Sequence, residues 1–293
     1  MDQSKPTDSL LLKNSEIHLS KLGFDIVHGC QLRCIGCPNS TIKPQVWPIT
    51  VADFKIILQN IDVKSVCLFR LFNFGEPLFN DNIGPILEAI SQWNVPVQKV
   101  EISTNGQYHN FESLFAGLQT GRLDSLAVSC DGDGTPEVYE RLRPPGKWSK
   151  LIHFLETVSK YSKDNNISTS LINRVICSDP EHQKRWKDLL QPIGWTPEFR
   201  DWQLLPESKL SYEDEFKSQF KSKTGVCSFI DRDTLYLDAT GEVVTCCVHP
   251  SVAVLGNLKN QLFSEIYNTK RKEFSNFLQN KREEHSICSQ CHY

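Results

Sequence analysis

The chain has 293 residues, of which 39% are hydrophobic and 23% are charged, and its formal net charge is −3. This ordinary balance gives no reason to expect nucleic acid or an anionic membrane as a partner. No apolar run reaches the roughly 18 residues that a membrane span needs, and the polar tail 1–22 lacks the apolar core of a signal peptide. We therefore expect a cytoplasmic protein with no membrane or nucleic-acid partner.

Short strand-like runs alternate with helical patterns between residues 23 and 205. The expected strands are 23–27, 65–74, 97–104, 123–129, 168–177 and 197–205. The helices expected between them are 50–61 with Thr50 as its cap, 81–93, 110–119, 150–162 and 180–190. Six β/α units predict an α/β fold built on a parallel sheet, in the form of a partial (β/α)6 barrel. A full barrel would need two further units.

The pattern changes after Pro206. Residues 206–226 are charged and are expected to form a connector, and 227–293 are expected to form a small C-terminal domain. Within that domain, 233–247 predicts a β-hairpin around the turn "DATG", and 262–278 has helical spacing of its apolar residues.

Eleven cysteines are a high count for a chain without an export signal. In a reducing compartment, clustered cysteines more often bind metal than form disulfides. The cysteines fall into an early group and a C-terminal group, and three others lie scattered in apolar runs. The scattered cysteines, Cys67, Cys130 and Cys177, are expected to be plain buried thiols.

The early group has the spacing C-x-x-x-C-x-x-C, formed by Cys30, Cys34 and Cys37. It follows the first expected strand directly, at the end of a β/α barrel where active sites form. Three thiolates can hold three corners of a 4Fe–4S cube and leave the fourth iron open to a chelating ligand. The alternative is a zinc site whose fourth ligand lies elsewhere in the chain.

This motif, in this place, resembles that of the radical S-adenosylmethionine (SAM) enzymes. The resemblance implies that the amino and carboxylate groups of SAM occupy the fourth iron. It also implies that SAM is cleaved to methionine and a deoxyadenosyl radical, which abstracts hydrogen from a substrate. An electron donor such as flavodoxin or ferredoxin is then implied as a partner.

Three further stretches resemble family elements that follow successive strands: "NFGEP", "STNG" and "SCDG". Gly75 would allow close backbone approach, and Glu76 would accept hydrogen bonds from the SAM ammonium. For each stretch, a turn stabilised by side-chain hydrogen bonds is the alternative. The candidate cofactor-binding residues are Gly75, Glu76, Pro77, Ser103, Asn105, Ser129 and Asp131.

The C-terminal cysteines resemble the Twitch subset of SPASM-type radical SAM enzymes. In that pattern a first cysteine precedes a G-x-x-x-x-C hairpin, a helix and a C-x-x-C pair. The further cysteines of a full SPASM pattern are absent from the sequence, so one auxiliary 4Fe–4S cluster is implied, with a four-thiolate zinc site as the alternative. The implied ligands are Cys227, Cys246, Cys288 and Cys291.

Three residues are candidates for direct chemistry. Cys247 should point away from the face of Cys246 and could donate hydrogen to a substrate radical, while His249 would return to its side. Arg174, on the fifth strand, could bind a polar substrate or the SAM carboxylate.

We expect oxidation of an alcohol to a ketone in a sugar, aminocyclitol or similar small molecule, as in aminocyclitol dehydrogenases. Epimerisation with Cys247 as donor, as in aminoglycoside epimerases, is one alternative, and peptide modification is another. A scaffold protein that carries iron–sulfur or zinc without catalysis is the non-enzyme alternative. Leader-binding domains of peptide-modifying relatives need more residues than the stretch before the first strand offers, which favours the small substrate.

Overall fold

The structure is a computed structural model that describes residues 17–200, 227, 233–249 and 252–291. The expected connector, 206–226, lies outside the described residues, as does the end of the sixth expected strand. None of the helices among the described residues combines the length and apolar character of a membrane span.

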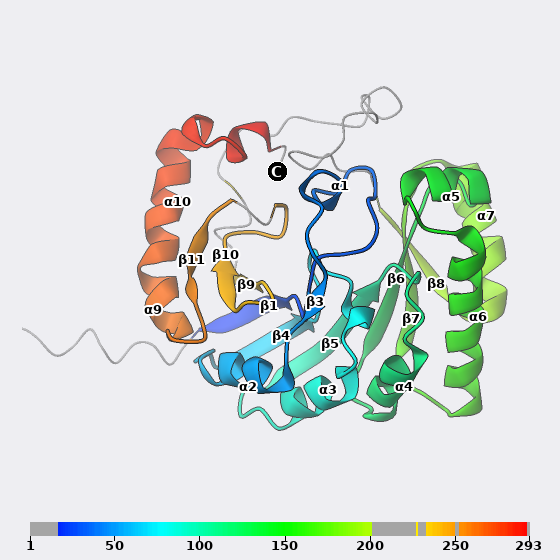
Figure 1. Cartoon of the computed structure of the whole chain (residues 1–293), viewed down its shortest axis with the longest axis horizontal. Coiled ribbons are helices and arrows are strands. Elements are labelled where there is room, and N and C mark those ends of the chain that lie inside the picture. Colours follow the sequence, from blue (N-terminus) through cyan, green and yellow to red (C-terminus); the bar gives the residue numbers. More distant parts are fainter. Residues whose placement is uncertain (1–16, 201–226, 228–232, 250–251, 292–293) are drawn as a thin grey trace, which may run out of the picture.

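A nine-stranded sheet forms the centre of the molecule (Figure 1). Seven of its strands are parallel, and six neighbouring ones follow one another in the sheet in their order along the chain. These six strands are β1 (His18–Phe24), β4 (Ser65–Arg70), β5 (Val97–Thr104), β6 (Ser125–Asp131), β7 (Ser170–Ile176) and β8 (Thr196–Arg200). The partial (β/α)6 barrel predicted from the sequence is thereby confirmed.

The first strand lies earlier than predicted. It spans His18–Phe24 instead of 23–27, so that residues 18–22 belong to the sheet and not to a polar tail. Its polar residues weaken the sequence signal for a strand, yet its backbone pairs with β4 on one side and β9 on the other. Backbone pairing on both sides outweighs the weak strand propensity of this segment.

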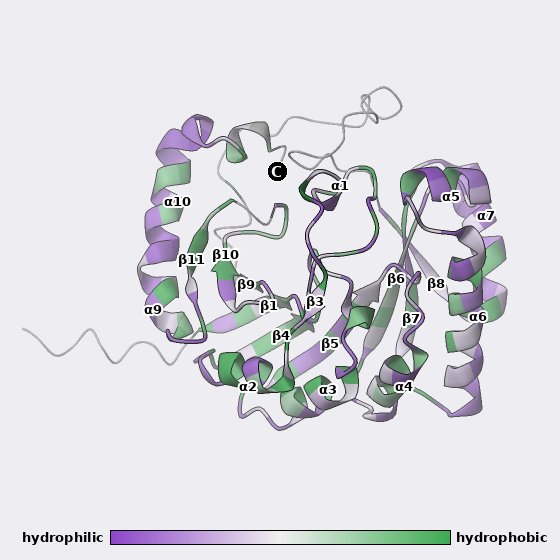
Figure 2. Cartoon of the chain, viewed as in Figure 1, coloured by the Kyte–Doolittle hydropathy of each residue, from purple (hydrophilic) through white to green (hydrophobic). Residues whose placement is uncertain are grey.

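Helices cover one face of the sheet (Figure 1), and hydrophobic and hydrophilic residues alternate along them (Figure 2). Thr50 caps the first long helix, where its hydroxyl accepts from the backbone N–H of Asp53 at 3.0 Å. The predicted helices are confirmed as α2 (Val51–Gln59), α3 (Ile83–Ser91), α4 (Phe111–Gln119), α6 (Trp148–Asp164) and α7 (Pro180–Leu190). The buried residues of α2, α3 and α4 are mostly apolar. Two short helices, α1 (Asn39–Ile42) and α5 (Pro136–Leu142), were not predicted.

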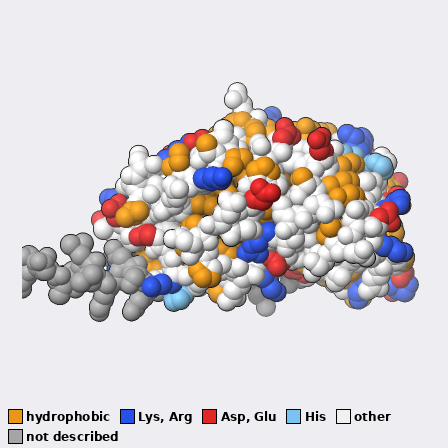
Figure 3. Space-filling view, turned by 90° about the horizontal axis from the view of Figure 1, so that it is seen from below, with side chains coloured by type: hydrophobic (Ala, Val, Ile, Leu, Met, Phe, Trp, Pro, Cys, Tyr) orange, Lys and Arg blue, Asp and Glu red, His pale blue; other side chains and the backbone are white. Residues whose placement is uncertain are grey.

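The core fills the space between the sheet and these helices. Phe54 of α2 stacks on Phe24 at 5.0 Å between ring centroids, and Trp186 of α7 is fully buried. Seen from the side of α2, α3 and α4, the outer surface mixes hydrophobic side chains with charges of both signs (Figure 3).

The C-terminal segment extends the same sheet. The predicted hairpin is confirmed as β9 (Thr234–Leu237) and β10 (Glu242–Val244), and a third strand, β11 (Val254–Asn257), was not predicted. Strand β9 runs parallel to β1 and joins the hairpin to the barrel. The predicted helix 262–278 is divided at Thr269 into α9 (Phe263–Asn268) and α10 (Lys270–Lys281).

Candidate active site

The early cysteines lie on a loop whose two ends are held together. A short antiparallel pair, β2 (Val27–His28) and β3 (Trp47–Pro48), closes the loop at its base. At its tip, the backbone N–H groups of Arg33 and Ile35 donate to the carbonyls of Pro144 and Leu142 at 2.6 and 2.9 Å. The loop is therefore fixed to the chain that follows β6, although more than a hundred residues separate the two in sequence.

Hydrogen-bond donors surround the sulfur atoms of this loop. The backbone N–H of Leu32 and the side-chain amide of Asn105 both lie 3.4 Å from Cys30 Sγ. Arg143 Nη1 lies 3.7 Å from Cys34 Sγ. Burial raises the pKa of the Cys34 thiol to about 12, so metal binding there must displace a proton. Donors aimed at sulfur stabilise cluster-bound thiolates, so these residues fit the predicted cluster.

Asp25 organises the "NFGEP" loop, a role that the sequence analysis missed. Its carboxylate accepts from the backbone N–H groups of Asn73, Phe74 and Gly75 at 2.6, 3.0 and 2.9 Å. A Cβ atom on Gly75 would lie 1.8 Å from the carbonyl oxygen of Val27. Gly75 therefore makes the close backbone approach that was predicted, and it makes this approach to Val27 of the same chain.

Glu76 joins this loop to the end of β5. It is buried and accepts from the Thr104 hydroxyl at 2.5 Å, the Asn105 N–H at 2.8 Å and the Leu78 N–H at 3.2 Å. Burial raises its pKa to about 7, although these hydrogen bonds act in the opposite direction. Pro77 begins a 3-10 turn, Pro77–Phe79, directly after it. In the structure, Glu76 positions Asn105 by accepting from its backbone N–H. That Glu76 contacts SAM stays a prediction.

The end of β6 carries an ion pair that points to the same loop. Asp131 was a candidate for contact with SAM or substrate, and its carboxylate accepts from Arg143 Nε at 2.6 Å. Arg143, another residue that the sequence analysis missed, thereby aims its guanidinium at Cys34. Ser103 is buried and Ser129 half-buried, and their strand positions share the face of Asp131.

The Asp25 carboxyl predicts a pH dependence of stability. Burial raises its pKa to about 6, above the value of about 3.9 expected in an unfolded chain. The folded protein therefore holds this proton more tightly, and the contribution of Asp25 to stability falls as pH rises from about 4 to about 6. Asp25→Asn keeps the shape without the charge and should flatten this part of the profile of thermal midpoint against pH.

Glu76 titrates near the same range, so Glu76→Gln is the matched comparison. That variant should flatten the profile between about pH 4 and pH 7, a window that extends higher because the Glu76 pKa is about 7. A profile that is equally steep in wild type and in Asp25→Asn would contradict the assignment.

The C-terminal cysteines gather in a second, smaller hydrophobic cluster under α10. Cys246 and Cys288 are buried there, and Cys227 and Cys291 pack against them. Burial raises the pKa of Cys246 to about 11, while the N–H groups of Val248 and His249 lower it. The four predicted ligands thus lie together. As at Cys30 in the first loop, backbone N–H groups lie beside the Cys246 sulfur.

Among the described residues, no three Cys, His, Asp or Glu side chains converge on one point in the manner of a zinc site. In a 4Fe–4S cube each thiolate binds a different iron, so the sulfurs need not converge as closely.

Cys247 has different neighbours from Cys246. Burial raises the pKa of its thiol, and the neighbouring Tyr236 hydroxyl, Lys21 and Arg70 lower it. These neighbours lie on the inner face of the sheet, opposite the helices. The ring of Tyr236 lies over Gly23, where a Cβ atom would be 3.0 Å from Tyr236 Cδ1. His249 is buried, and its predicted catalytic role stays a prediction.

Arg174 also lies on the inner face, in an ion-pair network with Glu101 at 2.5 Å and Glu198 at 3.6 Å.

The three scattered cysteines differ in their exposure to solvent. Cys130 is buried as predicted, whereas Cys177 is half-buried. Cys67 is exposed, so the prediction of a buried thiol is wrong there. It lies on β4 between buried Val66 and half-buried Leu68.

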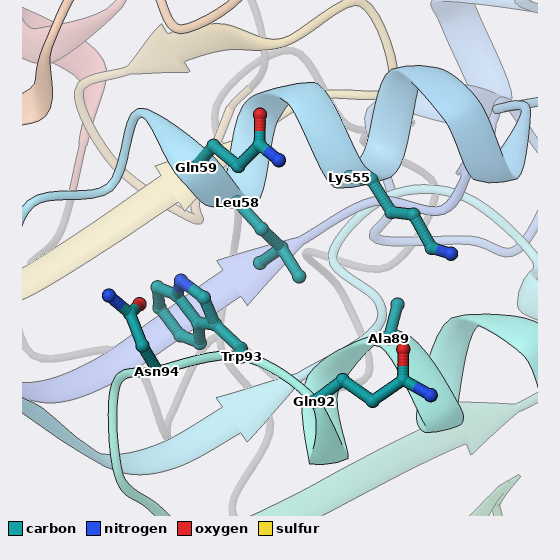
Figure 4. A pocket seen from close by; sticks show the side chains of 7 residues that line it. All are labelled: Lys55, Leu58, Gln59, Ala89, Gln92, Trp93 and Asn94. Carbon is teal, nitrogen blue, oxygen red and sulfur yellow. The ribbon is translucent and has the colours of Figure 1, made fainter.

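Two cavities lie outside the two cysteine groups. One of about 400 Å³ lies between α2 and the end of α3, on the helical side, and its walls include Lys55, Gln92 and Trp93 (Figure 4). The other, of about 190 Å³, lies between the loop of the early cysteines, the "NFGEP" loop and the hairpin, with Gly29, Asp25 and Asp238 in its wall. Neither contains any of the predicted cluster ligands.

Comparison with known proteins agrees with this geometry. The family model of the radical SAM superfamily matches residues 25–175, and that of the iron–sulfur cluster-binding SPASM domain matches residues 227–292. No curated protein sequence matches the chain.

Solved structures of anSMEcpe share the fold. Native anSMEcpe with bound AdoMet aligns with a TM-score of 0.61 and 15% identity over 92% of this chain and 88% of that one. Native anSMEcpe with bound AdoMet and Cp18Cys peptide aligns with a TM-score of 0.59 and 16% identity, with the same coverage. At such identities the likeness concerns the fold alone.

Proposed function

Because this chain belongs to the radical SAM superfamily, we propose that it abstracts hydrogen from a small polar molecule and oxidises an alcohol to a ketone. Its cofactors are SAM and 4Fe–4S clusters. When bound, these cofactors supply the hydrogen-abstracting radical and a one-electron acceptor, while the protein supplies binding, orientation and exclusion of water. The substrate would lie against the inner face of the sheet, between the two groups of cysteines.

Residues of the first loop would hold the cluster, and residues that face this loop would bind SAM. Cys30, Cys34 and Cys37 would hold three irons and leave the fourth for SAM. Arg143, fixed by Asp131 beside Cys34, is suited to the SAM carboxylate, because a guanidinium binds a carboxylate through two parallel hydrogen bonds.

The second group of cysteines supports oxidation. Cys227, Cys246, Cys288 and Cys291 offer four thiolates, enough to ligate a cluster completely and leave it no open position. Cys246 belongs to this group, and its neighbour Cys247 lies at the inner face beside Tyr236. A substrate at the inner face would thus lie close to the second cluster. The position of Cys246 in the cysteine group, next in sequence to Cys247 at the inner face, is the observation that carries the proposal.

Epimerisation is the second candidate, favoured by the position of Cys247. Its thiol lies beside Tyr236 at the inner face, where it could return hydrogen to a carbon radical of a substrate bound there. Peptide modification remains a third candidate, since anSMEcpe has been seen with a bound peptide. An external flavodoxin- or ferredoxin-type donor and a reducing cytoplasm would suit oxygen-sensitive clusters and free thiols.

Cys247→Ala separates oxidation from epimerisation. The holoenzyme would first be screened with SAM and dithionite against sugars, aminocyclitols and peptides for deoxyadenosine release. For an oxidation, Cys247→Ala should retain most of its activity, and the product should be two hydrogens lighter than the substrate. For an epimerisation, the variant should still release deoxyadenosine but form no inverted product.

Isotope labelling and a control variant complete this experiment. In deuterated water an epimerase should place one deuterium at the inverted carbon, because a thiol hydrogen exchanges with solvent. Cys177→Ala, at a half-buried thiol outside both cysteine groups, should behave as wild type. Full epimerase activity in Cys247→Ala would eliminate the donor role, and absence of deoxyadenosine with every substrate class would refute the proposed function.

A further inference from the structure

A polar row crosses the inner face of the sheet. Tyr236, Gly23, Arg70 and Glu101 are successive register partners on β9, β1, β4 and β5. Arg174 reaches the row from β7, where its register partner is Glu198 on β8. Register partners project to the same face of a sheet, so these side chains lie opposite the helices, together with Cys247.

Positive charge exceeds negative charge at the centre of this row. Arg70 Nε lies 2.9 Å from one oxygen of Glu101, and Arg174 Nη2 lies 2.5 Å from the other. One carboxylate therefore serves two guanidinium groups. Glu198 compensates little, because it lies 3.6 Å from Arg174 Nε and is engaged by Arg200 at 2.5 Å.

The two arginines are also shielded from water. The exposed fraction is 10% for the Arg174 side chain and 23% for that of Arg70. Their guanidinium carbons lie 5.6 and 5.7 Å from the centre of the Phe72 ring. Within the described residues, the buried Arg174 Nε makes no hydrogen bond. A buried donor without a hydrogen bond is costly.

The direction of the pKa shift of Arg174 agrees with this excess of positive charge. Burial lowers the pKa of Arg174, and repulsion from Arg200 and Arg70 lowers it further, although Glu101 acts in the opposite direction. The site thus has positive charge to spare for a ligand.

We propose that Arg70 and Arg174 form a binding site for an anionic group of the substrate, a carboxylate or a phosphate. The inference rests on the proposed function for the location of the substrate and deepens it by naming the substrate class. Planar guanidinium groups match the oxygens of carboxylates and phosphates, and Phe72 would fix their orientation. The SAM carboxylate is a less suitable occupant, because Arg143 already lies beside the cluster loop.

Small anions test this site without knowledge of the substrate. The SAM-bound holoenzyme would be titrated with acetate and with inorganic phosphate at constant ionic strength, with chloride as the replaced ion. Binding would be followed by the thermal midpoint and by line broadening of the ¹³C or ³¹P signal. At least one anion should bind in the millimolar range, and its identity distinguishes a carboxylate from a phosphate.

Variants link the binding to the arginines. Arg174→Gln and Arg70→Gln should each weaken anion binding at least ten-fold, and Arg174→Lys should restore part of it. Arg122→Gln is the matched control, because Arg122 is a comparably shielded arginine paired with Asp124 at 2.9 Å before β6. It should bind the anion as wild type does.

Two results would overturn the site: no binding of either anion, or equal binding in wild type and in the two glutamine variants. Release of deoxyadenosine from SAM under dithionite is measured in parallel and reports the proposed function separately. An enzyme that cleaves SAM but binds no anion would refute only this further inference.

Discussion

Replacement of Cys30, Cys34 and Cys37 by alanine together is expected to abolish SAM cleavage. It should also lower the iron content from about eight to about four atoms per chain, since each cubane cluster holds four irons. The reason is that the three thiolates of this loop hold one cluster, whereas the second group of cysteines lies in a separate hydrophobic cluster under α10. Anaerobic reconstitution, iron and sulfide analysis, and deoxyadenosine release measure these quantities.

Two further variants make this experiment specific. Cys67→Ala removes an exposed cysteine outside both groups and should change neither iron content nor activity. Cys288→Ala should remove the second cluster and leave the first able to bind SAM. Stoichiometric zinc, without the brown colour of an iron–sulfur protein after anaerobic purification, would contradict both cluster assignments.

The cysteine pattern and the barrel could be predicted from the sequence because each depends on nearby residues. The spacing of Cys30, Cys34 and Cys37 is fixed within one loop, and a helix cap such as Thr50 acts within one turn. Alternation of strands and helices then places the ends of parallel strands at one edge of the sheet. The third strand of the C-terminal segment, β11, carries no comparable local signal in its four residues.

Contacts between distant segments supplied what the sequence left open. Asp25 looked like an ordinary strand residue, and only the fold brings it to the backbone of 73–75. Arg143 lies 109 positions from Cys34, whose sulfur it faces. Tyr236 meets Cys247 and Gly23 because β9 pairs with β1 across two hundred residues. Local sequence periodicity does not indicate contacts between such distant residues, so the surroundings of the cysteines could not be predicted from the sequence.

The wrong start of the first strand has the same origin. His18, Ser20 and Lys21 make the strand look polar, but its backbone is paired on both sides and Leu19 and Leu22 are buried. A strand in the middle of a sheet can carry polar residues when one of its faces lines a site. Lys21 is such a residue, because it lies near Cys247 on the inner face.

Gly75→Ala is expected to damage the SAM site more than any other single methyl group added to the loop. The new Cβ would lie 1.8 Å from the Val27 carbonyl oxygen and 3.3 Å from Asp25 Oδ1. Backbone atoms can yield only if the loop moves, and overpacking of this kind costs about 1–3 kcal/mol of stability, occasionally more. The hydrogen bonds from 73–75 to Asp25 would be displaced with the loop, and Glu76 would lose its place at the end of β5.

The expected result of Gly75→Ala is therefore a lower thermal midpoint together with SAM binding weakened at least ten-fold, by about 1.4 kcal/mol or more. Equilibrium dialysis of SAM against the reconstituted protein measures the second effect. Gly84→Ala in α3 is the matched control, since its Cβ would only touch the Ala116 Cβ at 3.4 Å and alanine favours a helix. Wild-type SAM affinity in Gly75→Ala would show that this loop lies outside the cofactor site. A loss of affinity in Gly75→Ala with wild-type affinity in Gly84→Ala would tie the loss to the single contact between Gly75 and Val27.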